Sequence, residues 1–203
     1  MKKYIVIYNK NSRGKTYSKQ DLEMIFSSHD LDSKIFVTNE IKEVDKIVKN
    51  FKNSNDYVYC AIGGDGTLNS LVNALLRNNI NNPEVACIAS GSGSDFMRTF
   101  AMPADIHQAI SRIKNNQNYS IDASLIESKT KSRYFINVLN YGFLAETVNL
   151  SEKLPNMFKR FRYPISFWLK LFTGKQSIFN LKTNTYEFDK KAFNVSICNG
   201  QFF

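Results

Sequence analysis

The chain has 203 residues, of which 43% are hydrophobic and 22% are charged, a composition that excludes a disordered protein and is typical of a globular one. Lys and Arg number 27 against 18 Asp and Glu, and the resulting net charge of +9 favours an anionic partner: nucleotide phosphates, nucleic acid or an anionic membrane surface. No apolar run is long enough to span a membrane, and the apolar stretch at the N-terminus is too short for a signal peptide. The three cysteines lie in apolar runs, which favours buried, reduced thiols in a cytoplasmic protein: Cys60, Cys87 and Cys198.

Strands and helices alternate in the first half of the chain. Runs of apolar and β-branched residues predict strands over residues 4–8, 34–38, 57–62 and 85–89. Apolar residues at helical spacing predict helices over residues 19–28, 41–51, 67–77 and 104–114. Repeated strand–helix units predict a doubly wound α/β domain, with a parallel sheet covered by helices on both faces. We place this domain at residues 1–118.

Strands dominate the second half, which we expect to form a β-rich domain over residues 119–203. The pattern predicts strands over 119–127, 133–140, 177–188 and 192–198, with polar turns at 128–132 and 189–191. It predicts helices over 144–153 and 163–172. The chain ends on apolar Phe202 and Phe203 with no polar tail, so we expect this second domain to be incomplete.

A glycine-rich turn follows the strand expected at 57–62 and reads Gly63-Gly64-Asp65-Gly66-Thr67-Leu68-Asn69. Glycines let a ligand approach the backbone, and the helix that follows directs its N–H groups and positive dipole end at that ligand. A phosphate group suits this position. The carboxylate of Asp65 would repel a bare phosphate, which suggests a divalent cation between them. The alternative is a glycine turn with an aspartate cap, although the full motif is more specific than a pair of glycines.

Two more polar loops follow neighbouring strands. Gly91-Ser92-Gly93-Ser94-Asp95 comes after the strand expected at 85–89, and residues 9–15 come after the first strand. Because carboxyl ends of parallel strands meet at one sheet edge, where ligands bind in such folds, we expect these loops to lie beside the glycine-rich turn. Taken alone, the loop at residues 9–15 is only a solvated turn.

These motifs, followed by Ile121-Asp122, Arg133–Val138 and Gly142–Glu146, resemble in sequence and order the diacylglycerol kinase catalytic family, which includes bacterial lipid kinases and sphingosine kinases. The resemblance runs along the whole chain. It implies an α/β nucleotide-binding domain like that of NAD kinase and phosphofructokinase, then a β-rich domain of β-sandwich type, with the site between them. It also implies magnesium-dependent transfer of the γ-phosphate of ATP to the hydroxyl of diacylglycerol or a similar lipid.

The resemblance further assigns site residues. Those implied to contact the nucleotide lie in the glycine-rich turn and neighbouring loops: Asn9, Ser12, Thr38, Gly63, Gly64, Asp65, Gly66, Thr67, Leu68, Asn69 and Ser92. Those implied to surround magnesium, through water, are Asp65, Asp95 and Asp122. The family's acidic general base lies in strands expected beyond residue 203, so no catalytic base is assigned, and we expect the chain as written to bind nucleotide weakly and transfer little phosphate.

The chain departs from the family pattern at several positions: Ser70 replaces a glutamate, Ser94 replaces an asparagine and Lys10 replaces a proline. These departures keep open a non-catalytic nucleotide- or lipid-binding homologue. An NAD kinase-like phosphotransferase is a second alternative, because that family also carries Gly-Gly-Asp-Gly-Thr. The resemblance implies a lipid substrate at a membrane surface, a cytoplasmic protein peripheral to the inner face of the membrane, and a homodimer. No nucleic-acid-binding motif is present.

Aromatic and basic residues alternate over residues 157–172. A basic aromatic helix can lie on an anionic membrane. The alternative, which aromatic stripes at helical spacing favour, is that this helix packs on the second domain's sheet through Phe167, Trp168, Leu171 and Phe172.

Overall fold

The computed structural model describes residues 2–12, 14–52, 56–90, 94–115, 118–158 and 161–202. Ser92, Lys159 and Arg160, which the sequence singles out, lie outside these ranges. The chain forms two compact units, one comprising Met1–Asn137 with Asn199–Phe203 and the other Val138–Cys198. The first unit therefore continues past residue 118, where we expected the second domain to begin.

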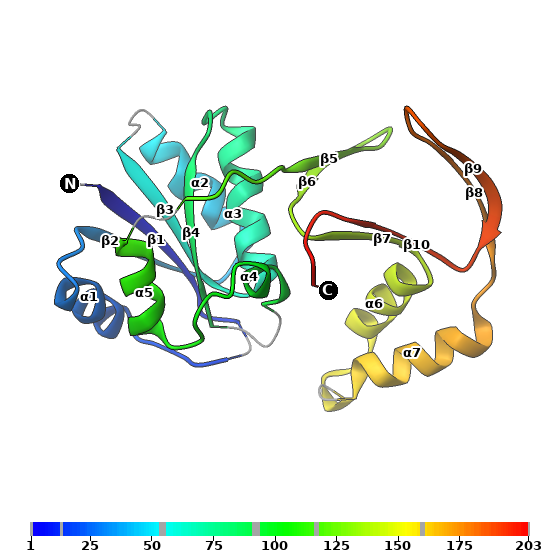
Figure 1. The fold of residues 1–203 in the computed structure, drawn as a ribbon. Coiled ribbons are helices and arrows are strands. Elements are labelled where there is room, and N and C mark those ends of the chain that lie inside the picture. The colour runs from blue at the N-terminus through cyan, green and yellow to red at the C-terminus, as the bar shows by residue number, and fades with distance from the viewer. Residues whose placement is uncertain are drawn as a thin grey trace. The chain divides into compact units, whose positions relative to one another are not determined.

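The first unit is built on a parallel sheet with the strand order β2-β1-β3-β4 (Figure 1). Its strands are β1 (Lys3–Asn9), β2 (Ser33–Thr38), β3 (Tyr57–Gly63) and β4 (Glu84–Ala89). The helices in the same part of the chain are α1 (Lys19–Ser28), α2 (Ile41–Phe51), α3 (Asp65–Arg77), α4 (Asp95–Thr99) and α5 (Ile106–Lys114). The predicted α/β architecture is confirmed.

Helices cover both faces of the sheet, which explains why its strands read as continuous apolar runs. On one face, Tyr4, Val6 and Tyr8 of β1 belong to a buried cluster with residues of α1 and α5. On the other face, Ile5 and Ile7 belong to a cluster with residues of α2 and α3. Alternate residues of β1 thus supply two separate cores, as the two-residue period of a strand requires.

The chain changes direction across the sheet between β1 and β3. Helix α1 leads from β1 outward to β2, while α3 leads from β3 the opposite way to β4. Because α1 and α3 lie on opposite faces, the loops that follow β1 and β3 leave the sheet edge in opposite directions. In open α/β sheets, ligands bind at such a switch point, at the carboxyl ends of the strands.

Ser18 caps α1 through a reciprocal pair of hydrogen bonds. The Asp21 N–H donates to Ser18 Oγ (3.0 Å), and the Ser18 N–H donates to the Asp21 carboxylate (2.9 Å). We expect Ser18→Ala to lower the free energy of unfolding by about 1 kcal/mol in urea denaturation, because an N–H at the helix start loses its acceptor. Ser28→Ala, at the other end of α1, is the control. An equal loss in both variants would contradict the capping role.

The cap also predicts a pH dependence. The hydrogen bonds from Ser18 hold the pKa of Asp21 below its ordinary value of 3.8. A lowered folded-state pKa means that the carboxylate stabilises the fold above pH 3.8 and that this contribution is lost as the pH falls through the folded-state pKa. The difference in stability between the wild type and Asp21→Asn should therefore shrink in acid.

Short antiparallel pairs dominate the rest of the chain, so the β-rich part is confirmed. In the first unit, β5 (Ser124–Glu127) pairs with β6 (Ser132–Phe135). In the second unit, β7 (Val138–Gly142) pairs with β10 (Asn194–Cys198), and β8 (Ser177–Lys182) pairs with β9 (Glu187–Ala192). The second unit also contains α6 (Phe143–Lys153), a short 3-10 helix η1 (Asn156–Phe158) and α7 (Arg162–Thr173).

Helix α7 packs in the second unit through fewer residues than predicted. Ser166 is buried, and the ring of Phe167 lies 5.2 Å from that of Phe143 at the start of α6. Trp168 and Phe172 are exposed and stack on each other with centroids 6.2 Å apart, so the prediction that they also pack on the sheet is wrong.

Three of the predicted strands are wrong in extent. The strand predicted over 119–127 begins only at Ser124. The strand predicted over 133–140 is divided between β6 and β7, because at Asn137 the backbone oxygen accepts hydrogen bonds from Asn199 and Gly200 instead of continuing a ladder. The strand predicted over 177–188 turns after Lys182, where Thr183 Oγ1 accepts a hydrogen bond from the Tyr186 N–H (2.9 Å).

The turn predicted at residues 189–191 is also wrong, because these residues lie inside β9. Asp189 is paired with Asn180 and Lys190 with Phe179 of β8. The charged residues of this hairpin are exposed, so their polarity does not indicate a turn.

The cysteine prediction holds only in part. All three thiols are free, and Cys60 is buried, but Cys198 is exposed. Burial raises the pKa of Cys87 to about 12, which keeps this thiol protonated and unreactive. None of the helices within the described ranges is long and apolar enough to cross a lipid bilayer.

Candidate functional site

The junction between β3 and α3 places a helix N-terminus at the switch point of the sheet. Gly64 is the N-cap residue of α3, and its carbonyl accepts hydrogen bonds from the N–H groups of Thr67 (3.0 Å) and Leu68 (3.2 Å). A Cβ atom at Gly63 would collide with the side chain of Thr67, so glycine is needed there for packing. A Cβ atom at Gly66 would meet nothing within 4 Å. The exposed backbone at Gly66 is therefore open to a ligand.

The loop after β1 is joined to this helix start. Asn9, the last residue of β1, donates a hydrogen bond from Nδ2 to Thr67 Oγ1 (3.2 Å) and accepts one at Oδ1 from the Asn11 N–H (2.9 Å). The structure thus brings Asn9 to the glycine-rich turn, as expected. Thr38 is placed differently: its buried hydroxyl donates to the Tyr8 carbonyl (3.3 Å), so it is used within the sheet.

Ser90, which the sequence did not single out, connects the loops that follow three strands. Its N–H donates to the Gly63 carbonyl (3.0 Å), and its Oγ donates to the Lys15 carbonyl (2.8 Å). Its own carbonyl accepts a hydrogen bond from Ser12 Oγ (3.2 Å). Ser90 is buried and holds Ser12 at the edge of the sheet where Gly63 lies. A serine directly after a buried strand is the signal that could have indicated it.

The carboxylate of Asp65 connects α3 with α4. It accepts hydrogen bonds from the N–H groups of Asp95 (3.0 Å) and Phe96 (3.2 Å). Burial raises the pKa of Asp65 above its ordinary value, and the charge of Asp95 raises it further, although the two N–H groups and Arg98 act in the opposite direction. An anionic group in this setting is stabilised by a nearby cation.

The three aspartates predicted to surround magnesium lie in different surroundings. Asp65 and Asp95 are neighbours, and the Asp95 carboxylate also accepts a hydrogen bond from Arg98 (2.9 Å). Asp122 is exposed, and its backbone carbonyl accepts a hydrogen bond from Asn199 Nδ2 (2.7 Å). Within the described ranges, no group of three or more His, Cys, Asp or Glu residues is placed to hold a metal ion directly.

Leu68 and Asn69 differ in what they offer a ligand. The Leu68 side chain is buried in the core between the sheet and α3, so it serves packing. The Oδ1 atom of Asn69 is buried and has no hydrogen-bond partner among the described residues. A buried acceptor of this kind favours the approach of a donor or a cation.

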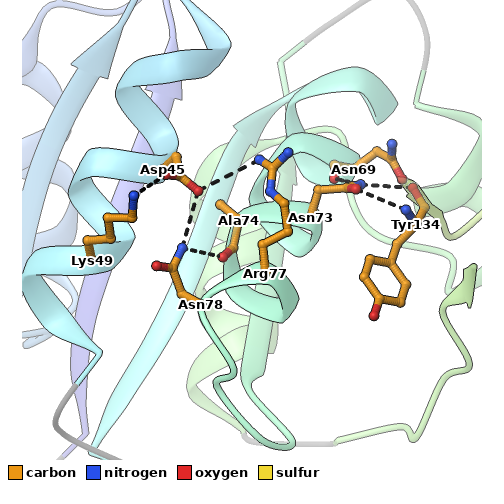
Figure 2. A network of polar contacts seen from close by, with 8 residues as sticks. All are labelled: Asp45, Lys49, Asn69, Asn73, Ala74, Arg77, Asn78 and Tyr134. Carbon is orange, nitrogen blue, oxygen red and sulfur yellow. Dashed lines mark hydrogen bonds and ion pairs between the residues drawn. The ribbon is translucent and has the colours of Figure 1, made fainter. Parts of the chain in front are cut away.

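Asn73, one turn after Asn69, fixes α3 to β6 (Figure 2). Its Nδ2 donates to the carbonyls of Asn69 (2.8 Å) and Tyr134 (2.8 Å), and its Oδ1 accepts from the Tyr134 N–H (2.9 Å). The amide therefore pairs with the backbone of Tyr134 as a neighbouring strand would. Farther along α3, Arg77 and Asn78 contact Asp45 of α2.

The sequence model of the diacylglycerol kinase catalytic domain family matches residues 3–126 of this chain. The chain belongs to this family. The match includes β1 to β4, the glycine-rich turn and all three predicted magnesium aspartates.

Curated diacylglycerol kinases from Staphylococcus saprophyticus and Staphylococcus aureus are each 29% identical to this chain over 170 residues, which is 82% of the chain. The alignments cover 53% and 51% of those proteins, so the chain spans about half the length of the curated relatives it matches. A crystal structure of a diacylglycerol kinase from Bacillus anthracis has a TM-score of 0.66 and 21% sequence identity, covering 99% of this chain and 65% of that one. This likeness confirms the fold.

One departure from the diacylglycerol kinase pattern has a structural explanation. Ser70, where the family pattern has glutamate, is buried and donates a hydrogen bond from Oγ to the Gly66 carbonyl (2.7 Å). The Ser70 hydroxyl is therefore used in a hydrogen bond within the first turn of α3. A glutamate at this position would extend beyond the helix backbone, so this chain lacks one carboxylate near the glycine-rich turn.

Proposed function

We propose that this chain carries the nucleotide site of a lipid kinase that transfers the γ-phosphate of ATP to the hydroxyl of diacylglycerol or a similar lipid. One observation carries the proposal: the N-terminus of α3 lies at the switch point of the sheet, joined to Asn9 of β1 by the bond to Thr67. A helix start at this place in a parallel sheet is suited to bind phosphate groups. Membership of the diacylglycerol kinase family supports phosphate transfer.

Backbone and side-chain groups from several loops of the chain would hold the nucleotide. Backbone N–H groups of Gly64, Asp65 and Gly66 would bind phosphate oxygens beside the open backbone of Gly66. Asn9 would add an amide from the first loop. Ser12 is assigned a contact by family membership, although its hydroxyl donates to the Ser90 carbonyl. We also assign nucleotide contacts to Thr38 and Ser92 by family membership, although the buried Thr38 hydroxyl is used by the sheet.

The residues present fit a magnesium ion. The Asp65 carboxylate lies beside the backbone of Asp95, whose charge acts on it, and the buried Oδ1 of Asn69 lacks a partner among the described residues. Oxygen atoms of this kind suit Mg²⁺, which usually keeps several waters and so needs few direct protein ligands. Asp65, Asp95 and Asp122 would hold the ion through its waters. When bound, magnesium neutralises charge on the phosphate oxygens.

We further propose that the lipid is met at a membrane surface, with the protein peripheral to the inner face of the membrane. The net charge of +9 supports attraction to an anionic surface. We also propose that the protein forms a homodimer and has no nucleic-acid partner.

The function is tested with the natural full-length protein that contains this chain. It is incubated with γ-labelled ATP and magnesium, and with mixed micelles of diacylglycerol, phosphatidylglycerol or a sphingoid base, in parallel with NAD. We expect label in one lipid. Label in NAD alone would contradict the proposal and support an NAD kinase-like enzyme. Binding of ATP without label in any acceptor would instead support a non-catalytic homologue.

A further inference from the structure

The two histidines of the sequence lie side by side in the first unit. His29 Nε2 is 3.0 Å from His107 Nδ1, although 78 residues separate them in the chain. The ring of His29 is half-buried and that of His107 is exposed, so solvent reaches the pair. A dissolved metal ion can reach it equally well, and imidazole is a common ligand of Zn²⁺, Ni²⁺ and Cu²⁺.

Helices α1 and α5 hold the backbones of the two histidines in place. His29 is the C-cap residue of α1, and its carbonyl accepts a hydrogen bond from Lys114 Nζ of α5 (2.9 Å). The His107 N–H donates to the carboxylate of Asp105, the N-cap residue of α5 (3.1 Å). Buried residues of both helices belong to one core cluster. The two rings therefore start from fixed positions, and little order has to be created before both contact one ion.

The spacing of the two nitrogens suits a single metal ion. Zn²⁺ binds imidazole nitrogen at about 2.0–2.1 Å, so two such ligands on a tetrahedral ion lie about 3.3 Å apart. The 3.0 Å between His29 Nε2 and His107 Nδ1 is close to this distance. The ring centroids are 5.3 Å apart, which places the two nitrogens between the rings, in line for a hydrogen bond. A turn of the rings about their side-chain bonds would direct both lone pairs to one ion.

The charges beside the pair favour a cation. Asp30 follows His29 in the chain, and Asp105 is bonded to the backbone of His107. The ammonium of Lys114 lies 3.2 Å from the Asp30 carboxylate and offsets one of these two negative charges. Within the described part of the chain, no third His, Cys, Asp or Glu joins the rings in a metal-holding group, so water would complete the coordination of the ion.

We propose that His29 and His107 bind Zn²⁺ and thereby fasten α1 to α5. Two nitrogen ligands favour Zn²⁺ over Mg²⁺, which prefers oxygen. The site thus differs in position and in chemistry from the magnesium site proposed around Asp65. It requires no nucleotide, so it can succeed or fail separately from the proposed kinase activity.

Calorimetric titration of this chain with Zn²⁺, without a histidine tag and without nucleotide, tests the proposal. We expect one Zn²⁺ to bind per chain, in the presence of a large excess of Mg²⁺, and to raise the Tm, because the ion binds the folded state. His107→Gln should weaken the binding at least tenfold and abolish the rise in Tm, because one of two protein ligands is removed. Equal affinity in His107→Gln, or no binding at millimolar Zn²⁺, would overturn the proposal.

Cys198→Ser is the matched control, because it removes the exposed thiol, the other side chain that binds Zn²⁺ well. It should leave the affinity unchanged, whereas a loss in Cys198→Ser that exceeds the loss in His107→Gln would place the ion elsewhere and contradict the proposal.

NMR spectra identify the ligands independently, since His29 and His107 supply all the imidazole signals of this chain. We expect Zn²⁺ to change the ring signals of both histidines together, reaching saturation at one ion per chain, while Mg²⁺ changes neither. A change confined to one of the two rings would mean that the pair does not share an ion, and the proposal would be wrong.

Discussion

Replacing Asp65 with Asn should reduce phosphate transfer to lipid by two orders of magnitude or more in the full-length protein, on the order of other losses of transition-state charge stabilisation. Asp65 begins α3 at the switch point, and with Asp95 it offers the carboxylates suited to magnesium. The amide of Asn keeps the size of the side chain and removes the charge. Initial rates with labelled ATP measure the loss.

The same substitution should leave the fold nearly as stable as before at neutral pH. Burial raises the pKa of Asp65, so the ionised carboxylate costs stability as the pH rises from the ordinary value of 3.8 through the folded-state pKa. Asn removes this cost, but it replaces one of the two oxygens that accept from the Asp95 and Phe96 N–H groups with an NH2 group, which cannot accept. A loss of activity with little change in Tm is the expected signature of a functional carboxylate.

Asp45→Asn is the matched control and should behave in the opposite way. Partial burial acts to raise the pKa of Asp45, but Lys49, Asn78 and Arg77 together hold it below its ordinary value. This carboxylate therefore stabilises the fold above pH 3.8, and the contribution is lost as the pH falls through the folded-state pKa. Asp45→Asn should lose stability at neutral pH and keep activity. Full activity in Asp65→Asn would contradict the proposed site.

Asn73→Ala should lower the free energy of unfolding by about 3 kcal/mol, the cost of leaving buried backbone groups without partners. The amide is buried and makes three hydrogen bonds, two of them to the backbone of Tyr134 in β6. Alanine has no group to replace them. Urea denaturation of the wild type and the variant measures the difference.

Asn78→Ala provides the comparison for Asn73. The Asn78 amide donates to the Ala74 carbonyl (2.8 Å) and to Asp45 (3.2 Å) at the end of α3, where water can replace both bonds. We expect it to cost about 1 kcal/mol. Similar losses in the two variants would mean that the pairing of Asn73 with β6 does not hold α3 in place.

The first half of the fold could be predicted from the sequence because its elements are long and strongly patterned. Helix α1 begins and ends at the predicted residues, and the strand before Gly63 was found because it is buried on both faces. The glycine-rich turn was found for a related reason, since it follows a buried strand and precedes an amphipathic helix. Both signals are local in the chain.

The rest depends on contacts that are distant in the sequence. Asn73 pairs with the backbone of Tyr134, and Ser90 bonds to the backbone of Lys15. A backbone carbonyl has the same chemistry at every residue, so nothing in the sequence indicates these partners. The hairpin of β8 and β9 has charged residues inside a strand, so the position of polar residues does not indicate where its turn lies.

The most direct test of the nucleotide site is a titration of this chain with magnesium and ATP, followed by the chemical shifts of its backbone amides in NMR spectra. The method detects weak binding, and so suits the low affinity expected for the chain as written. We predict that the largest changes occur at Asn9, Ser12 and residues 63–69, and that they are lost in Asp65→Asn. Changes centred elsewhere, or none at millimolar ATP, would contradict a phosphate site at the N-terminus of α3.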